Sequence, residues 1–234
     1  MDDQFLRYSR QIFIEDIGVE GQRRLSGAKV LVVGAGGLGS PIIQYLAAAG
    51  VGHLAVIDFD ILEIHNLNRQ VIHKEREVGR AKVENARRFV AALNSSIHFE
   101  GILKKLTPEN SVEYIKDYDV IVDGSDNFAT RYLINDTCVG LDKPLVYGSI
   151  FKNSGQIAVL NYRGSKNLRD LFPEPPSSQG LPDCDRFGVL GALPGIVGSM
   201  MAMHTLQIIL GAKVMCNQLQ VIDTASWEFN KVAF

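Results

Sequence analysis

The feature that most constrains this chain is a glycine-rich turn, Gly34-Ala35-Gly36-Gly37-Leu38-Gly39, which follows a short apolar run. The run at 29–33 is rich in valine and predicts a buried strand, whereas residues 40–49 predict a helix. Gly34, Gly36 and Gly39 have GxGxxG spacing. In a strand–turn–helix unit, such glycines permit a tight turn and let the backbone approach a phosphate at the helix N-terminus. The pattern therefore predicts a nucleotide site.

A carboxylate stands where a nucleotide ribose is expected. Asp58 lies nineteen residues after Gly39, at the end of a second predicted strand over 53–57. At this place a carboxylate can accept hydrogen bonds from ribose hydroxyls. Both the glycines and Asp58 also suit a dinucleotide, so an NAD-dependent Rossmann oxidoreductase is one alternative.

The fold class follows from the alternation of strands and helices, which is typical of a mostly parallel α/β sheet with helices on both faces. Short amphipathic helices are expected over 3–25, and a C-terminal antiparallel extension is expected beyond the parallel part. We interpret 1–234 as a single nucleotide-binding domain with a long crossover loop at 162–188. Further strands are predicted at 96–103, 118–122, 145–150, 155–161, 218–223 and 227–233, and further helices at 78–93, 112–116, 130–139 and 192–210.

Composition narrows the possible partners. Of the 234 residues, 24 are Lys or Arg and 26 are Asp or Glu, so the net charge of −2 gives no general attraction to nucleic acid or acidic membranes. Three scattered cysteines and an N-terminus without an apolar core favour a cytoplasmic protein without disulfides. The uncharged segment 187–212 is long enough for a membrane span, but its proline, glycines and polar residues favour a buried helix in the core or at a dimer interface.

Cations and amides follow the second strand. The segment at 65–70 contains His65, Asn66, Asn68, Arg69 and Gln70, and Lys82 comes shortly after it. On the ligand side of a parallel sheet, two cations with amide donors suit a triphosphate better than a pyrophosphate bridge. The alternative for each residue alone is a solvated loop or a helix-surface lysine.

The fourth predicted strand ends in Asp123-Gly124-Ser125-Asp126-Asn127. Mg²⁺ typically binds one or two carboxylates together with phosphate oxygens, so a carboxylate at this strand end is a candidate metal ligand. We assign Asp126 to Mg²⁺ and regard Asp123 as structural. The alternative is that Asp126 or Asn127 caps the helix that follows.

Taken together, these motifs resemble the HesA/MoeB/ThiF family, the bacterial relatives of ubiquitin-activating enzymes. The matching pieces occur in family order over nearly the whole chain. They are RYSRQ at 7–11, GAGGLGS at 34–40, DFD at 58–60, NLNRQ at 66–70, VGRAKVENA at 78–86, DGSDN at 123–127 and GVLGALPGIVGSMMAM at 188–203.

The resemblance implies an ATP-dependent adenylyltransferase. Family members activate the C-terminal carboxylate of a ubiquitin-like sulfur carrier of the MoaD/ThiS type, ending in Gly-Gly, for molybdopterin or thiamine synthesis. Pyrophosphate is released. Attack by a carboxylate on a phosphate is slowed mainly by charge repulsion, so cations are the natural catalysts.

Site roles are implied in the same way. Arg10, supplied by the partner in a homodimer, together with Arg69, Lys82 and Asp126, is expected to be catalytic. The nucleotide-binding set comprises Gly34, Gly36, Gly37, Gly39, Asp58, Asp60, His65, Asn66, Asn68, Arg69, Gln70, Lys82, Asp126 and Asn127.

The chain departs from the family at its cysteines. Many relatives hold a structural zinc with two CxxC pairs, but the first pair is replaced here by residues 167–170 and the second is missing. We therefore expect no structural zinc. Cys184 matches a cysteine that links covalently to the carrier in the thiamine branch, and it could instead be an inherited residue without that role. A catalytically silent carrier-binding relative and a peptide-modifying relative are the remaining alternatives.

Overall fold

The computed structural model describes residues 6–175 and 188–234. Its eight strands form one sheet in the order β3-β2-β1-β4-β5-β6-β7-β8. The pairs from β3 to β5 are parallel and those from β5 to β8 are antiparallel. The predicted fold class, a mostly parallel α/β sheet with an antiparallel C-terminal extension, is confirmed.

The strands are β1 (Lys29–Val33), β2 (His53–Ile57), β3 (His98–Ile102), β4 (Val120–Asp123), β5 (Leu145–Phe151), β6 (Ser154–Leu160), β7 (Gln218–Asp223) and β8 (Glu228–Ala233). The described α-helices are α2 (Ser9–Ile12), α3 (Gly18–Gly27), α4 (Gly39–Ala49), α5 (Lys82–Leu93), α6 (Ser111–Ile115), α7 (Phe128–Gly140), α8 (Leu168–Leu171) and α10 (Ala192–Leu210). Two short 3₁₀ helices, η1 (Ile64–Asn66) and η2 (Glu75–Glu77), lie between β2 and α5.

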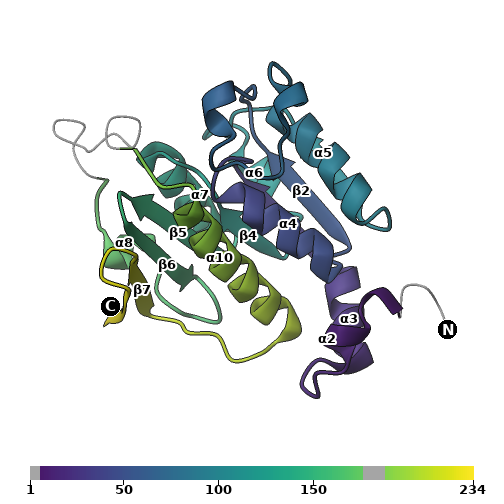
Figure 1. Ribbon diagram of the computed structural model, residues 1–234. Coiled ribbons are helices and arrows are strands. Elements are labelled where there is room, and N and C mark those ends of the chain that lie inside the picture. The colour runs from purple at the N-terminus through teal and green to yellow at the C-terminus, as the bar shows by residue number, and fades with distance from the viewer. Residues whose placement is uncertain (1–5, 176–187) are drawn as a thin grey trace.

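Both faces of the parallel strands are buried. Val30 and Val32 of β1 pack into a core with α4, α5 and α10, whereas Leu31 and Val33 pack into a second core with α6 and α7. Figure 1 shows α4, α5 and α10 side by side over one face of the sheet. Burial on both faces explains why β1 is a continuous apolar run rather than an alternating one.

Helix α10 lies against the centre of the sheet, and small residues let it come close. A Cβ added at Gly148 of β5 would lie 2.1 Å from the Met201 sulfur, and one added at Gly155 of β6 would lie 2.3 Å from Val197. By length and composition alone α10 could cross a membrane, with a mean hydropathy of 1.4, but 50% of that window is buried within the chain. Its apolar surface is therefore used largely for packing within the fold.

For segment 187–212 the sequence left open a core helix or a dimer interface, and two of its glycines pack within the chain. A Cβ at Gly198 would meet Pro41 of α4 at 2.4 Å, and one at Gly191 would meet the Asn68 carbonyl oxygen at 2.0 Å. Gly195 has no such neighbour within 4 Å. The close approaches at Gly191 and Gly198 thus occur inside one chain.

The structure differs from the sequence-based expectation most clearly at the start of α5 and in the loop at 162–188. The helix expected from 78 begins at Lys82, because Gly79 has φ +87° and residues 75–77 form a 3₁₀ turn. The predicted loop at 162–188 contains helix α8, which Asn167 caps by accepting the Arg169 N–H at 2.9 Å. An ion pair of 2.7 Å between Arg169 and Asp136 of α7 holds α8 in place.

Candidate functional site

A cavity of about 380 Å³ opens at the carboxyl ends of the parallel strands. This is the edge at which ligands bind in open α/β sheets. Most of the residues proposed from sequence line it. They are Gly34, Gly36, Gly37, Asp58, Asp60, His65, Asn68, Arg69, Gln70, Lys82, Asp126 and Asn127.

The turn between β1 and α4 needs glycine at two of its positions. Gly34 has φ +98°, which side chains rarely adopt. A Cβ on Gly39 would lie 2.0 Å from the Gly34 carbonyl oxygen. Gly39 does not line the cavity, so its contribution is to let the start of α4 close onto the turn.

Asp58, at the end of β2, binds the backbone of the glycine turn between β1 and α4. Its Oδ2 accepts the Ala35 N–H at 2.7 Å and its Oδ1 accepts the Asp60 N–H at 2.7 Å. Burial raises the pKa of Asp58, although these two bonds and nearby Lys82 oppose the rise. Each carboxylate oxygen has a second lone pair, so the group can still accept from a ligand hydroxyl.

The two predicted cations differ in how the chain holds them. Lys82 is buried, and its Nζ lies 2.8 Å from Asp60 Oδ2. Arg69 donates to the His65 carbonyl at 3.2 Å and to Asn68 Oδ1 at 3.0 Å. A Cβ on Gly37 would lie 3.4 Å from Arg69 Cγ, so the arginine stem runs beside the glycine turn.

At the end of β4, neighbouring side chains have different roles. Asp123 is fully buried and accepts bonds from the Ser125 N–H and hydroxyl at 2.9 and 2.6 Å, and burial raises its pKa. Asn127 caps α7 by accepting the Thr130 N–H at 2.9 Å. Asp126 is exposed, and among the described residues its carboxylate accepts one long hydrogen bond, of 3.4 Å, from the Asn127 side chain. The cap is therefore Asn127, and the Asp126 carboxylate faces the cavity with capacity to bind a ligand.

Several lining residues were missed from sequence. Arg131 of α7 is buried and donates to the Ser125 carbonyl at 3.0 Å. Lys104 and Lys105 follow β3, and the Lys105 ammonium lies 5.5 Å from the centre of the Phe59 ring. The rule that strand ends of a parallel sheet converge could have found both lysines. The other missed residues are Val33, Leu38, Ile57, Phe59, Leu106, Gly124, Ser125, Thr130, Ile150, Gly188 and Val189.

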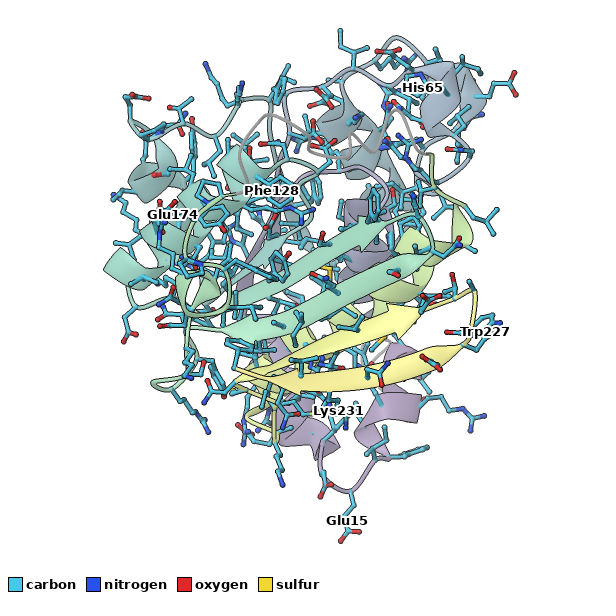
Figure 2. The ribbon with its side chains drawn as sticks, turned by 90° about the vertical axis from the view of Figure 1, so that its left-hand side faces the viewer. Glu15, His65, Phe128, Glu174, Trp227 and Lys231 are labelled. Carbon is cyan, nitrogen blue, oxygen red and sulfur yellow. The ribbon has the colours of Figure 1, made fainter. Side chains whose placement is uncertain are left out.

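Of the proposed residues in the described parts of the chain, Gly39, Asn66 and Arg10 do not line the cavity. Asn66 is buried, and its Oδ1 accepts the Glu63 N–H at 3.0 Å, which caps η1. Arg10 lies in α2, next to Gln11, whose side chain reaches the Ala49 carbonyl at the far end of α4. Figure 2 shows the same separation, with His65 at one end of the molecule and Glu15, just after α2, at the other. Cys184 lies outside the described residues.

Within 6–175 and 188–234, no group of three or more His, Cys, Asp or Glu side chains is arranged to hold a metal ion. The segment that replaces the first CxxC pair of relatives is held by other bonds. Besides the Arg169–Asp136 pair, the Tyr132 hydroxyl bridges the carbonyls of Phe172 and Glu174 at 2.9 Å each. The absence of structural zinc stays a prediction.

The fold and cavity define a nucleotide-binding α/β protein with a phosphate-binding turn, paired cations and an available carboxylate. Residues 8–234 match the ThiF family, and the chain belongs to that family.

Named relatives agree with this placement. The chain is 48% identical over 223 residues to the adenylyltransferase and sulfurtransferase MOCS3 of Anopheles gambiae, covering 95% of this chain and 51% of the relative. It is 44% identical over 232 residues to the sulfur carrier protein adenylyltransferase of Thermus thermophilus, covering 97% of this chain and 86% of that one. The chain thus spans about half the length of the MOCS3 relatives.

Solved structures show the same fold at lower identity. A structure of E. coli MccB with MccA-N7isoASN superimposes with a TM-score of 0.86 at 21% identity, covering 98% of this chain and 71% of that one. PaaA gives a TM-score of 0.83 at 20% identity, covering 100% and 74%.

Proposed function

We propose that this protein is an ATP-dependent adenylyltransferase that activates the C-terminal carboxylate of a ubiquitin-like sulfur carrier. The observation that carries the proposal is one cavity lined by the glycine turn, two basic side chains from the β2 side and the Asp126 carboxylate from the β4 side. An NAD site would need the glycine turn and Asp58, but it does not explain why Arg69, Lys82 and Asp126 line the same cavity. The names of the relatives from Anopheles gambiae and Thermus thermophilus support the same activity.

In the proposed reaction a carrier carboxylate oxygen attacks the α-phosphorus of ATP. The new bond is an acyl–phosphate bond, the bond to the β-phosphate bridging oxygen breaks, and pyrophosphate leaves with that electron pair. The attacking carboxylate is ionised at neutral pH, so no general base is required. Catalysis then depends on positioning and on neutralising negative charge, which Arg69 and Lys82 are placed to do.

Asp126 with Asn127 would hold the Mg²⁺ that accompanies ATP. The residues fit this ion, because an exposed carboxylate with one long hydrogen bond is available beside the predicted phosphate site. One carboxylate plus phosphate oxygens and water is a typical Mg²⁺ environment. The ion would supply charge neutralisation on the phosphate oxygens.

The carrier tail would reach the cavity from the side formed by Ile150 of β5 and by Gly188 and Val189. Val189 forms a parallel bridge with Lys152, so this segment extends the sheet at the mouth of the site. Figure 2 shows the face of the C-terminal strands β5 to β8 turned toward the viewer. We propose this face as the place where the folded part of the carrier docks.

A homodimer completes the site in this proposal. Arg10 lies at the end of the molecule opposite the cavity, so it can act only on the site of another copy. The surface around it is apolar: Leu6, Phe13, Ile14 and Val19 are each more than 40% exposed. Exposed apolar side chains that cluster in this way are typical of interaction surfaces.

The deciding experiment is ATP–pyrophosphate exchange measured with each candidate carrier of the molybdopterin and thiamine branches. Exchange with one carrier supports the proposal and identifies the branch. If NAD binds and no carrier or peptide supports exchange, an oxidoreductase is the better assignment. If a short peptide alone supports exchange, the protein is a peptide-modifying relative. We also propose a cytoplasmic location, in keeping with the free thiols of Cys138 and Cys216.

A further inference from the structure

His73 lies behind the glycine turn and outside the cavity. It belongs to the segment between η1 and η2 and is buried, with 6% of its surface exposed. Its Nε2 lies 2.9 Å from the Ala35 carbonyl oxygen. None of the activities discussed above gives this histidine a role.

The bond fixes the protonation of the ring. A carbonyl oxygen can only accept, so Nε2 carries the proton and donates to Ala35. The other nitrogen, Nδ1, is buried without a hydrogen-bond partner among the described residues. Burial lowers the pKa of His73, and of the nearby charged groups Lys82 lowers it further while Glu77 raises it. The ring is therefore a neutral donor at physiological pH.

Ala35 is held on both sides. Its N–H is accepted by Asp58 at 2.7 Å, and its carbonyl accepts from His73 at 2.9 Å. A trans peptide is planar, with the carbonyl and the following N–H pointing in opposite directions. Because the Ala35 carbonyl points back to His73, the N–H of Gly36 points away from it, toward the cavity that Gly36 lines.

The amides of the turn are available to a ligand. Among the residues that the structure describes, no protein acceptor takes the N–H of Gly36, Gly37 or Leu38. Glycine backbone rotates easily, so the peptide between Ala35 and Gly36 needs an outside contact to keep its direction.

We propose that His73 is a positioning residue that sets the Gly36 amide toward the nucleotide phosphates. The same contact joins the turn to the segment that carries Arg69, four residues earlier in the chain. The inference rests on the proposed use of ATP, because it concerns a phosphate ligand.

The test compares His73→Gln with His73→Leu and His73→Asn. Gln keeps a neutral N–H donor at a similar reach, Leu keeps volume without a donor, and Asn has a donor that is too short. Isothermal titration would measure the affinity for ATP·Mg and for adenosine, which has no phosphate. Melting temperature would report folding.

We expect His73→Leu and His73→Asn to weaken ATP binding at least tenfold while adenosine affinity changes less than twofold. His73→Gln should stay within threefold of the wild type for both ligands. Unchanged ATP affinity in His73→Leu, or an equal loss for adenosine, would overturn the positioning role. If Leu does not fold, the contrast between Asn and Gln decides. A wild-type protein that does not bind ATP would instead refute the proposed function.

Discussion

Two of the strand ends that border the cavity, those of β2 and β4, are built in opposite ways. At the β2 end, Asp58 accepts two backbone N–H groups and Asp60 pairs with Lys82, so the protein itself occupies the carboxylates. At the β4 end, buried Asp123 binds Ser125, while Asp126 remains exposed. The carboxylates at the β2 end therefore stabilise the local backbone, whereas the β4 end keeps one carboxylate available for a ligand.

The comparison predicts its largest effect at Asp126. Asp126→Ala should reduce ATP–pyrophosphate exchange by about a hundredfold or more, because charge on the triphosphate is no longer balanced at the point of attack. The melting temperature should not change, since the carboxylate has no strong bond within the chain. Asp117→Ala is a matched control, because Asp117 is exposed just before β4 at the opposite edge of the sheet. Normal exchange in Asp126→Ala would remove its metal role.

The second prediction concerns Arg10 on α2, which lies at the end of the molecule opposite the cavity. Arg10→Ala and Asp126→Ala proteins should each be inactive, and mixing them should restore activity. Random pairing makes about half of the dimers mixed, and one of the two sites in each mixed dimer has both residues, so up to about a quarter of wild-type activity is expected. Light scattering would confirm that the protein is a dimer, and a separate control would confirm that the two variants exchange subunits. An inactive mixture despite exchange would show that Arg10 does not act across subunits.

Asp58 should behave differently from Asp126. Asp58→Ala leaves the N–H of Ala35 without its acceptor in a buried place, which costs about 1–3 kcal/mol. We expect a melting temperature lower by several degrees, measured by calorimetry, together with weaker nucleotide binding. If Asp58→Ala is as stable as the wild type, the β2 end is not the rigid one and the comparison fails.

The smallest effect concerns pH. Burial lowers the pKa of His73 and of His204 on α10 below the ordinary 6.5. The unfolded chain then binds protons that the native state does not, so stability is complete above about pH 6.5 and falls as pH drops toward the native pKa. Each histidine contributes a slope of about 1.4 kcal/mol per pH unit in that window.

Urea unfolding of the wild type and of His204→Gln, at pH 7 and at a lower pH near 5.5, measures this slope. The raised pKa values of Asp58 and Asp123 act with the opposite sign, because protonation favours their native form as pH falls. A variant slope equal to that of the wild type would show that His204 titrates as in the unfolded chain.

Much of this fold could be predicted from short-range patterns. The bounds of β1, β2 and α10 agree with the sequence, because β1 and β2 are short apolar runs and α10 is a long segment without charged residues that ends at Gly211. Helix α8 was missed because the bond that holds it, from Arg169 to Asp136, joins residues far apart in the chain. The start of α5 was wrong because Gly79 has a left-handed backbone.

The candidate site was predictable to the extent that it is built from strand ends. Gly34, Asp58 and Asp126 lie where the parallel-sheet rule puts them. Asn66 was misplaced because sequence does not reveal which side chains of a loop turn inward to cap it. Arg131 was missed because it comes from the first turn of a helix, and its direction depends on packing against Tyr147, whose ring centre lies 5.6 Å from the guanidinium.

The Lys82–Asp60 pair gives the cavity an internal counter-ion. A single small anion, such as inorganic phosphate, would have to compete with Asp60 for the ammonium and would gain little in exchange. A nucleotide gains the turn amides, Asp58 and Arg69 at the same time, which outweighs that competition. On the proposed use of ATP, the pair would therefore disfavour small anions and favour ligands that carry several charges.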